Sequence, residues 1–137
     1  MLSRSVHTGL FVHDIQAMVT FYRDVLGFAT DWDGGPFASF EVDDGGLFMF
    51  DRREFARDMD QPYVPPSGAN LSMEIGLSVP TPQDVDAEHA RLVALGVEVV
   101  RPPTTQPWGQ RNVWILDPEG NYIEVGSPPR SAVEGTG

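Results

Sequence analysis

Hydrophobic and polar residues alternate along several short stretches of the chain, as expected for strands with one buried face. In residues 6–12, Leu10 and Val12 fall on one face, while His7 lies on the other. The same kind of pattern predicts further strands over residues 28–32, 37–42, 47–50, 71–79, 97–100, 113–116 and 122–125.

Two stretches show instead the three- and four-residue spacing of an amphipathic helix. The first follows Asp14, a residue type that caps helix N-termini, and ends at Gly27. The second follows Pro82 and ends at Gly96. The rest of the chain is expected to form a linker or flap with room for one helical turn, a loop, and a tail, over residues 52–70, 102–107 and 128–137 respectively.

The expected elements recur in the two halves of the chain. Leu10-x-Val12 returns 67 residues later as Leu77-x-Val79, and Asp43-x-x-Gly46 returns 74 residues later as Asp117-x-x-Gly120. Each half has a sheet face that it cannot bury by itself, so the two are expected to pair. The sequence therefore predicts a single α+β domain of two βαβββ modules that form a cupped mixed sheet, with the modules at about 5–51 and 71–127.

Composition narrows the function classes. The length of 137 residues fits one domain, and the absence of cysteine excludes disulfides and thiolate metal sites. No apolar run approaches the roughly 20 residues that span a bilayer, and no signal-peptide pattern opens the chain. We therefore expect a cytoplasmic protein without membrane contact. The formal net charge of −11 disfavours binding to nucleic-acid phosphates.

The repeat turns four single residues into a set. His7 and Glu74 are 67 residues apart, and each lies on the face opposite the Leu-x-Val pair of its strand. Glu124 and Phe50 each stand four residues after the glycine of their turn. If a pseudo-twofold axis relates the halves, these four side chains converge on the concave face. Each also has a structural interpretation, as a hydrogen-bonded histidine, a solvated carboxylate or a core phenyl group.

One imidazole and two carboxylates, with positions left open for substrate or water, suit a divalent Mn, Fe, Ni, Co or Zn ion. Such an ion could polarise a carbonyl or hydroxyl group of a substrate. The sequence thus predicts a metal site at His7, Glu74 and Glu124, with Glu124 as the candidate catalytic carboxylate. The alternative is that no metal binds. Glu74 is then a solvated residue of the cleft or pairs with an amine of the ligand.

Aromatic residues are predicted to line the same cavity and to contact a small-molecule ligand. Strand parity places Phe48 and Phe50 together and Tyr122 beside Glu124, while Trp108 precedes the last hairpin. Arg111 either anchors an anionic group or pairs with a surface carboxylate. The predicted substrate-binding residues are Phe48, Phe50, Trp108, Arg111 and Tyr122.

Three motifs carry a resemblance to a known family. They are His7-Thr8-x-Leu10-x-Val12-x-Asp14-Ile15, Phe21-Tyr22-Arg23-Asp24-Val25-Leu26-Gly27-Phe28 and Asp117-Pro118-Glu119-Gly120-Asn121-x-Ile123-Glu124. Together they resemble the vicinal oxygen chelate superfamily, which includes glyoxalase I, extradiol dioxygenases, fosfomycin-resistance enzymes and bleomycin-resistance binding proteins. The resemblance implies paired βαβββ modules, a homodimer, and metal ligands at the positions of His7 and Glu124.

The sequence departs from the family's pattern at two of these positions. Glu74 stands where a histidine is usual, and Phe50 stands where glyoxalase I has a carboxylate, so typical glyoxalase I activity is not expected. Two functions stay open. The first is a divalent-metal-dependent lyase, isomerase or dioxygenase acting on a small oxygenated substrate. The second is a metal-free binding protein that sequesters a hydrophobic or cationic small molecule or antibiotic, as bleomycin-type members do.

Overall fold

A computed structural model describes residues 1–129 of the chain, so most of the tail predicted at 128–137 lies outside the described residues. The chain divides into two compact units, Met1–Pro66 and a second unit that begins at Ser67. Each unit has its own sheet and its own buried side chains.

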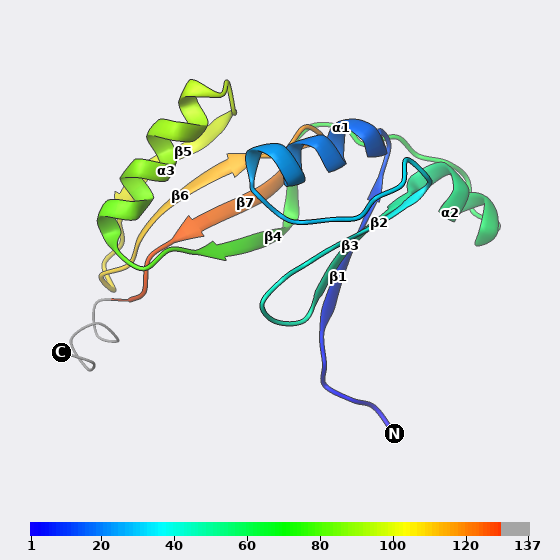
Figure 1. The fold of residues 1–137 in the computed structure, drawn as a ribbon, viewed down its shortest axis with the longest axis horizontal. Coiled ribbons are helices and arrows are strands. Elements are labelled where there is room, and N and C mark those ends of the chain that lie inside the picture. Colours follow the sequence, from blue (N-terminus) through cyan, green and yellow to red (C-terminus); the bar gives the residue numbers. More distant parts are fainter. Residues whose placement is uncertain (130–137) are drawn as a thin grey trace. The chain divides into compact units, whose positions relative to one another are not determined.

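The first unit contains a three-stranded mixed sheet in the order β1-β3-β2 (Figure 1). β1 runs parallel to β3, and β2 runs antiparallel to it. A helix, α1, follows β1 and continues into a π-helical turn, η1, and a second helix, α2, follows β3. The bounds are β1 His7–Val12, α1 Ile15–Thr20, η1 Phe21–Val25, β2 Phe37–Phe40, β3 Gly46–Asp51 and α2 Arg52–Asp58.

The alternation in β1 and β3 decides which face is buried. Leu10 in β1 and Met49 in β3 are buried and pair across the strands, whereas His7 points to the opposite, exposed face. The core-facing side is covered by α1, whose Met18 is fully buried. Asp14 starts this helix as expected, because its carboxylate accepts the backbone N–H of Ala17 at 3.1 Å.

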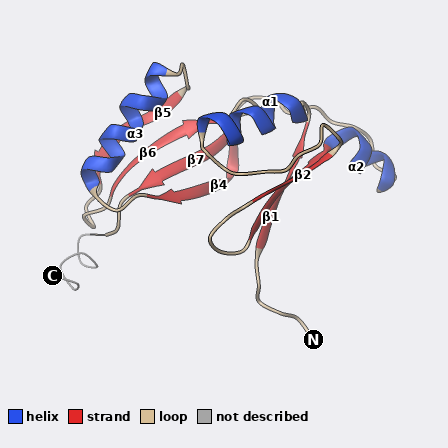
Figure 2. Cartoon of the chain, viewed as in Figure 1, coloured by secondary structure: helices blue, strands red, loops and turns tan. Residues whose placement is uncertain are grey.

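The second unit contains a four-stranded mixed sheet in the order β4-β7-β6-β5, with one helix, α3, on one of its faces (Figure 2). β4 runs parallel to β7, and the other neighbouring strands are antiparallel. The bounds are β4 Asn70–Ser78, α3 Pro82–Ala94, β5 Val99–Thr105, β6 Arg111–Leu116 and β7 Asn121–Gly126.

Helix α3 starts with a complete capping box. Thr81 accepts the backbone N–H of Asp84 at 3.2 Å, and Asp84 accepts the backbone N–H of Thr81 at 3.0 Å. The apolar face of the helix packs against β5, β6 and β7. Its fully buried Leu92 belongs to a core that includes Ile115 of β6 and Ile123 of β7. This core fixes which face of the sheet stays open.

The topology confirms the predicted α+β class with two βαβββ-like modules and mixed sheets. Two local predictions, a strand at 28–32 and a loop at 102–107, were wrong. Residues 28–32 form no strand, because only Thr30 makes an isolated bridge to Phe40. The helical turn expected within 52–70 is the short helix α2, which begins directly after β3 because Asp51 caps it by accepting the N–H of Glu54. β5 extends into the expected loop at 102–107, since prolines are tolerated on an edge strand.

Across residues 1–129, no helix combines the length and apolar character that crossing a bilayer requires.

Replacing Leu92 with alanine should lower the free energy of unfolding by about 2–5 kcal/mol, because it leaves a cavity in the core under α3. Leu95, at the end of the same helix, is 56% exposed, compared with 0% for Leu92. Leu95→Ala is therefore the matched control, with an expected change within about 0.5–1 kcal/mol. Urea denaturation followed by circular dichroism measures both, and equal losses in the two variants would contradict the assigned packing.

Candidate functional site

A row of residues crosses the face of the second sheet that α3 leaves open. The strand register pairs Arg101 in β5 with Trp114 in β6, and Trp114 with Glu124 in β7. Glu124 in turn pairs with Gly76 in β4. Paired residues share a face and neighbouring strands lie about 4.8 Å apart, so these positions lie side by side.

Glu124 and Glu74 form the chemical centre of this face. Glu74 pairs with Tyr122, which places it one row away from Glu124 on the adjacent strand. Burial, together with the hydrogen bond and the like charge of Glu74, raises the pKa of Glu124 from its ordinary value of 4.5 to about 7. Near neutral pH Glu124 is therefore partly protonated beside the carboxylate of Glu74.

Glycine at position 126 makes room for the carboxylate of Glu124. A Cβ atom at Gly126 would lie 2.5 Å from Oε1 of Glu124 and 2.9 Å from Nε2 of Gln110. Glu124 therefore leans along its own strand over the backbone of Gly126, toward the amide of Gln110. At Gly76, by contrast, a Cβ atom would meet Oε2 of Glu74 only at 4.0 Å, an ordinary contact.

The side chains of Trp108 and Asn112 hold Gln110 in a fixed orientation. Its Oε1 accepts hydrogen bonds from Nε1 of Trp108 at 3.0 Å and from the buried Asn112 at 3.5 Å. Asn112 itself accepts from Gln106 at 2.9 Å. Because Oε1 is occupied by donors, the NH₂ group of Gln110 is the end directed toward Glu124. Trp108, 56% exposed, thus contributes to the site through Gln110.

A cavity of about 430 Å³ lies on the same face of the second unit. Nε1 of Trp114 donates to Oε1 of Glu74 at 3.2 Å, so the indole is fixed against the carboxylate at the cavity wall. The volume is within the range of small-molecule sites. Most of the lining is apolar or aromatic, and it consists of Leu71, Ser72, Met73, Glu74, Val100, Arg101, Trp114 and Tyr122.

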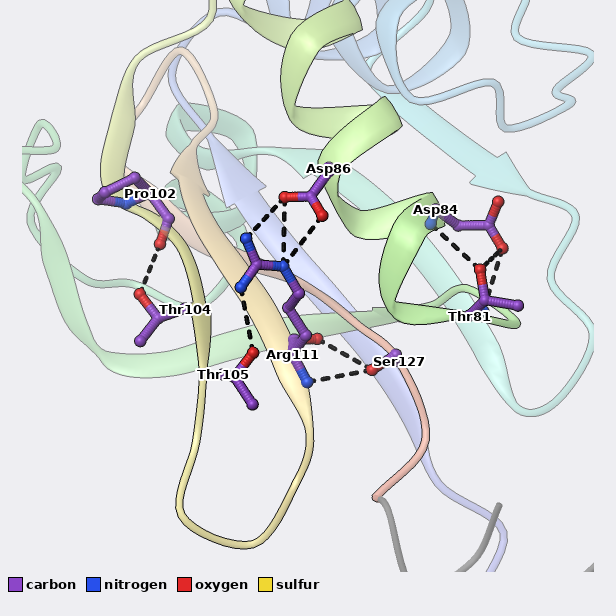
Figure 3. A network of polar contacts seen from close by, with 8 residues as sticks. All are labelled: Thr81, Asp84, Asp86, Pro102, Thr104, Thr105, Arg111 and Ser127. Carbon is purple, nitrogen blue, oxygen red and sulfur yellow. Dashed lines mark hydrogen bonds and ion pairs between the residues drawn. The ribbon is translucent and has the colours of Figure 1, made fainter. Parts of the chain in front are cut away.

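Arg111 lies on the other face of this sheet, where its side chain reaches α3 (Figure 3). Its Nη2 donates to Oδ1 of Asp86 at 2.8 Å, its Nε contacts the same carboxylate, and its Nη1 donates to Thr105 at 3.1 Å. The Asp86 carboxylate holds the pKa of Arg111 above its ordinary value, and Arg111 lowers that of Asp86. Of the two roles considered for Arg111, the structure shows the ion pair.

The first unit presents an aromatic face around His7. The His7 ring lies 5.2 Å from that of Phe48, and Phe48 and Phe50 both approach Phe37, at 5.6 and 6.2 Å between ring centroids. Phe50 also meets Phe55 of α2 at 5.9 Å. A sixth ring, that of Phe11, stacks on Phe55 at 3.9 Å. The predicted parity of Phe48 and Phe50 is confirmed.

Sheet register revises one correspondence between the halves. Aligning the turn glycines matched Glu124 with Phe50. In the strand pairing, however, Gly9 faces Phe48 just as Gly76 faces Glu124. Since the first strands of the modules align with an offset of 67, Phe48 is the register equivalent of Glu124. A phenyl group occupies the fourth position in either alignment.

The structure brings together two of the three predicted metal ligands. Glu74 and Glu124 interact directly in the second unit, and His7 belongs to the first. Within residues 1–129, neither unit by itself gathers three His, Asp or Glu side chains able to hold a metal ion. The carboxylate pair is an oxygen donor set of the kind that hard divalent ions prefer. The three-ligand set stays a prediction that joins the two units.

Sequence reasoning missed three polar or aromatic members of the cavity wall, Ser72, Arg101 and Trp114. Trp114 was not among the predicted site residues, although the hairpin register pairs it directly with Glu124. No sequence pattern indicated that Arg101 lines the cavity. Because β5 shifts register on both sides of Arg101, strand alternation cannot predict the sheet face to which its side chain points.

Comparisons with known proteins agree with this topology. The family model of the Glyoxalase/Bleomycin resistance protein/Dioxygenase superfamily matches residues 4–125. Over 128 residues the chain is 28% identical to the uncharacterized protein YwbC of Bacillus subtilis (strain 168), covering 90% of this chain and 97% of that protein.

Two solved structures illustrate the similarity of fold. A glyoxalase/bleomycin resistance protein/dioxygenase from Nocardioides superposes with a TM-score of 0.78 at 27% identity, over 95% of this chain and 87% of its own. A lactoylglutathione lyase from Agrobacterium tumefaciens gives a TM-score of 0.72 at 30% identity, over 92% and 94% of the two chains.

Replacing Glu124 with glutamine should change how stability depends on pH. The folded wild type holds the proton of Glu124 with a pKa of about 7, against an ordinary value of 4.5. The stabilising contribution of this proton is full below about pH 4.5 and is lost as the pH rises through about 7.

Urea denaturation across this pH range should show a fall in the free energy of unfolding for the wild type and a flatter profile for Glu124→Gln. Glu98→Gln, which changes an exposed carboxylate of the same unit, is the control and should retain the wild-type slope. Identical slopes in wild type and Glu124→Gln would show that Glu124 titrates normally.

Proposed function

Because the chain belongs to the glyoxalase/bleomycin resistance protein/dioxygenase superfamily, we propose that it is a divalent-metal-dependent enzyme acting on a small oxygenated substrate. The observation that carries the proposal is the pair Glu74 and Glu124, two interacting carboxyl groups on an open sheet face, of which Glu124 has a pKa of about 7. Mutual repulsion makes such a pair receptive to a cation that replaces the proton.

His7 is the third ligand in this proposal. It lies at the start of β1 as Glu74 lies in β4, and it is exposed on its sheet face. A neutral imidazole and two carboxylates suit Mn, Fe, Ni, Co or Zn, with open positions for substrate. The ligands are contributed by two modules, either of the same chain or of two chains. The assembly that we propose is a homodimer.

A bound ion would supply Lewis acidity to a carbonyl or hydroxyl oxygen of the substrate. The protein's own residues supply the rest. Glu124 would hold the ion as a carboxylate, and it is the candidate catalytic group that accepts a proton from the substrate. The indole N–H of Trp114 fixes Glu74, and the amide of Gln110 lies on the other side of Glu124. Lyase, isomerase and dioxygenase chemistry all fit these roles.

Glyoxalase I activity of the usual kind is not part of the proposal, although a lactoylglutathione lyase is among the similar structures. On the open face of β3 the chain carries Phe48 and Phe50, so this strand supplies no carboxylate as a fourth ligand. The substrate and the reaction are therefore expected to differ from those of that enzyme.

A second candidate function is supported by the aromatic face of the first unit. Six rings form a continuous chain of contacts there, and Phe11 and Phe37 are 46% and 47% exposed. Exposed aromatic side chains in contact favour binding of an apolar or cationic small molecule. A metal-free protein that sequesters such a molecule would use this surface without chemistry at Glu124.

Metal binding separates the two candidates. We expect wild-type protein, freed of its tag and dialysed against chelator, to bind about one equivalent of Mn²⁺, Fe²⁺, Ni²⁺ or Zn²⁺ in calorimetric titration. Glu124→Gln and His7→Ala should each lose this binding while keeping the wild-type circular dichroism spectrum. The wild-type affinity should weaken as the pH falls through about 7, because the ion competes with the proton of Glu124.

His89→Ala serves as the control, since this histidine lies in α3. A wild type that binds none of these ions would refute the metal-dependent enzyme and favour the binding protein. Binding that survives Glu124→Gln would place the metal elsewhere.

Gly126→Ala should weaken metal binding about 10-fold or more without removing any ligand, because the new Cβ displaces the carboxylate of Glu124. Gly76→Ala is the matched control on the same face, since its Cβ meets Glu74 only at 4.0 Å, and its affinity should stay close to that of the wild type. Calorimetry with Mn²⁺ compares the two, and equal affinities would show that the position of Glu124 is not critical.

A further inference from the structure

Arg101 is the cationic side chain that the proposed function leaves without a role. Of the described residues that line the cavity, it alone carries a positive charge. Within residues 1–129 its guanidinium makes one hydrogen bond, from Nε to Oγ1 of Thr104 at 3.4 Å, and no ion pair. In Arg111, by contrast, Nε, Nη1 and Nη2 all donate hydrogen bonds to Asp86 or Thr105 (Figure 3).

Irregular strand pairing around Arg101 affects the direction in which its side chain points. β5 shifts register between Val99 and Arg101 and again between Arg101 and Thr104. Such irregularities re-aim side chains and occur next to functional sites. Thr104 holds its own place by donating to the carbonyl oxygen of Pro102 at 2.8 Å (Figure 3), so the residue that contacts Arg101 is itself fixed.

The cavity is polar at two ends and apolar between them. Arg101 and Glu124 lie two strands apart, about 10 Å between their Cα atoms by the usual strand spacing, with Trp114 in the register position between them. Leu71, Met73 and Val100 add to the apolar lining. A ligand in this cavity therefore meets the guanidinium of Arg101 at one end, the indole of Trp114 in the middle and the carboxylate of Glu74, the neighbour of Glu124, at the other end.

We propose that Arg101 binds a carboxylate group of the substrate, so that the enzyme acts on small carboxylate-bearing molecules with an apolar or aromatic body. The free donors of the guanidinium match a carboxylate in a two-point arrangement. The oxygenated end that reacts then lies toward Glu74 and Glu124, and the body covers Trp114. This inference rests on the proposed function for the reaction, but the binding of the carboxylate does not require a metal.

The net charge of the protein matters for the interpretation of a preference for carboxylates over neutral ligands. With a formal net charge of −11, the protein as a whole repels small anions. A carboxylate that binds more tightly than its neutral analogue must therefore meet a local cation. Among the described residues that line the cavity, that cation is Arg101.

The test compares phenylacetate with its neutral analogue phenylacetamide. Both are titrated into ¹⁵N-labelled protein, and binding is followed by the indole N–H resonance of Trp114, which Trp114→Phe identifies. The wild type should bind phenylacetate about 10-fold more tightly than phenylacetamide, the size expected for one charge-assisted contact. In Arg101→Gln this ratio should fall to one or below, while Arg101→Lys should keep part of it.

Arg91→Gln is the matched charge control, because Arg91 lies on α3 and is paired with Glu88 at 2.7 Å. It should retain the wild-type ratio. The titrations are run with chelator and repeated with Zn²⁺. A wild type without a preference for phenylacetate, including one that binds neither compound, overturns the inference, as does a preference that survives Arg101→Gln. A protein that binds no metal but keeps an Arg101-dependent preference refutes the proposed enzyme alone.

Discussion

The parallel pairing of β4 with β7 is the constraint on which the candidate site depends. Glu74 and Glu124 are 50 residues apart in the sequence, and only this pairing brings them onto adjacent strands with their side chains on one face. Once there, the burial of Glu124, with the hydrogen bond and the like charge of Glu74, raises the pKa of Glu124 to about 7. The pair therefore exchanges a proton near neutral pH, and the proposed chemistry of the site depends on this property.

The buried face of the same sheet keeps that arrangement in place. Ile123 and Val125 flank Glu124 in β7, and their side chains belong to the core under α3. A slip of one residue in the register would bury Glu124 and expose this core, so the apolar residues fix the position of the carboxylate. Stability and site geometry thus depend on the same contacts. Substitutions on the open face of the sheet are therefore the ones that test the function without disturbing the core.

The two units contribute different chemistry. The second has a cavity of about 430 Å³ lined by Glu74, an indole fixed by Glu74 and a guanidinium, and Glu124 lies beside Glu74. The first contributes His7 within a chain of aromatic rings. An enzyme of this family would use the carboxylates with His7, whereas a binding protein would use the rings. The same chain therefore carries candidate residues for both of the functions considered, and the carboxylate pair favours the proposed enzyme.

The sequence by itself determined the fold class, the two modules and the faces of the strands, because side-chain periodicity and turn residues report local geometry directly. It also identified Glu74 and Glu124 through the repeat. Only the tertiary structure decided that Arg111 pairs with Asp86, that Phe48 is the register equivalent of Glu124, and that Trp114 and Arg101 line the cavity. These facts follow from strand register, irregularities in β5 and contacts with α3, and long-range pairing of this kind leaves no local pattern in the sequence.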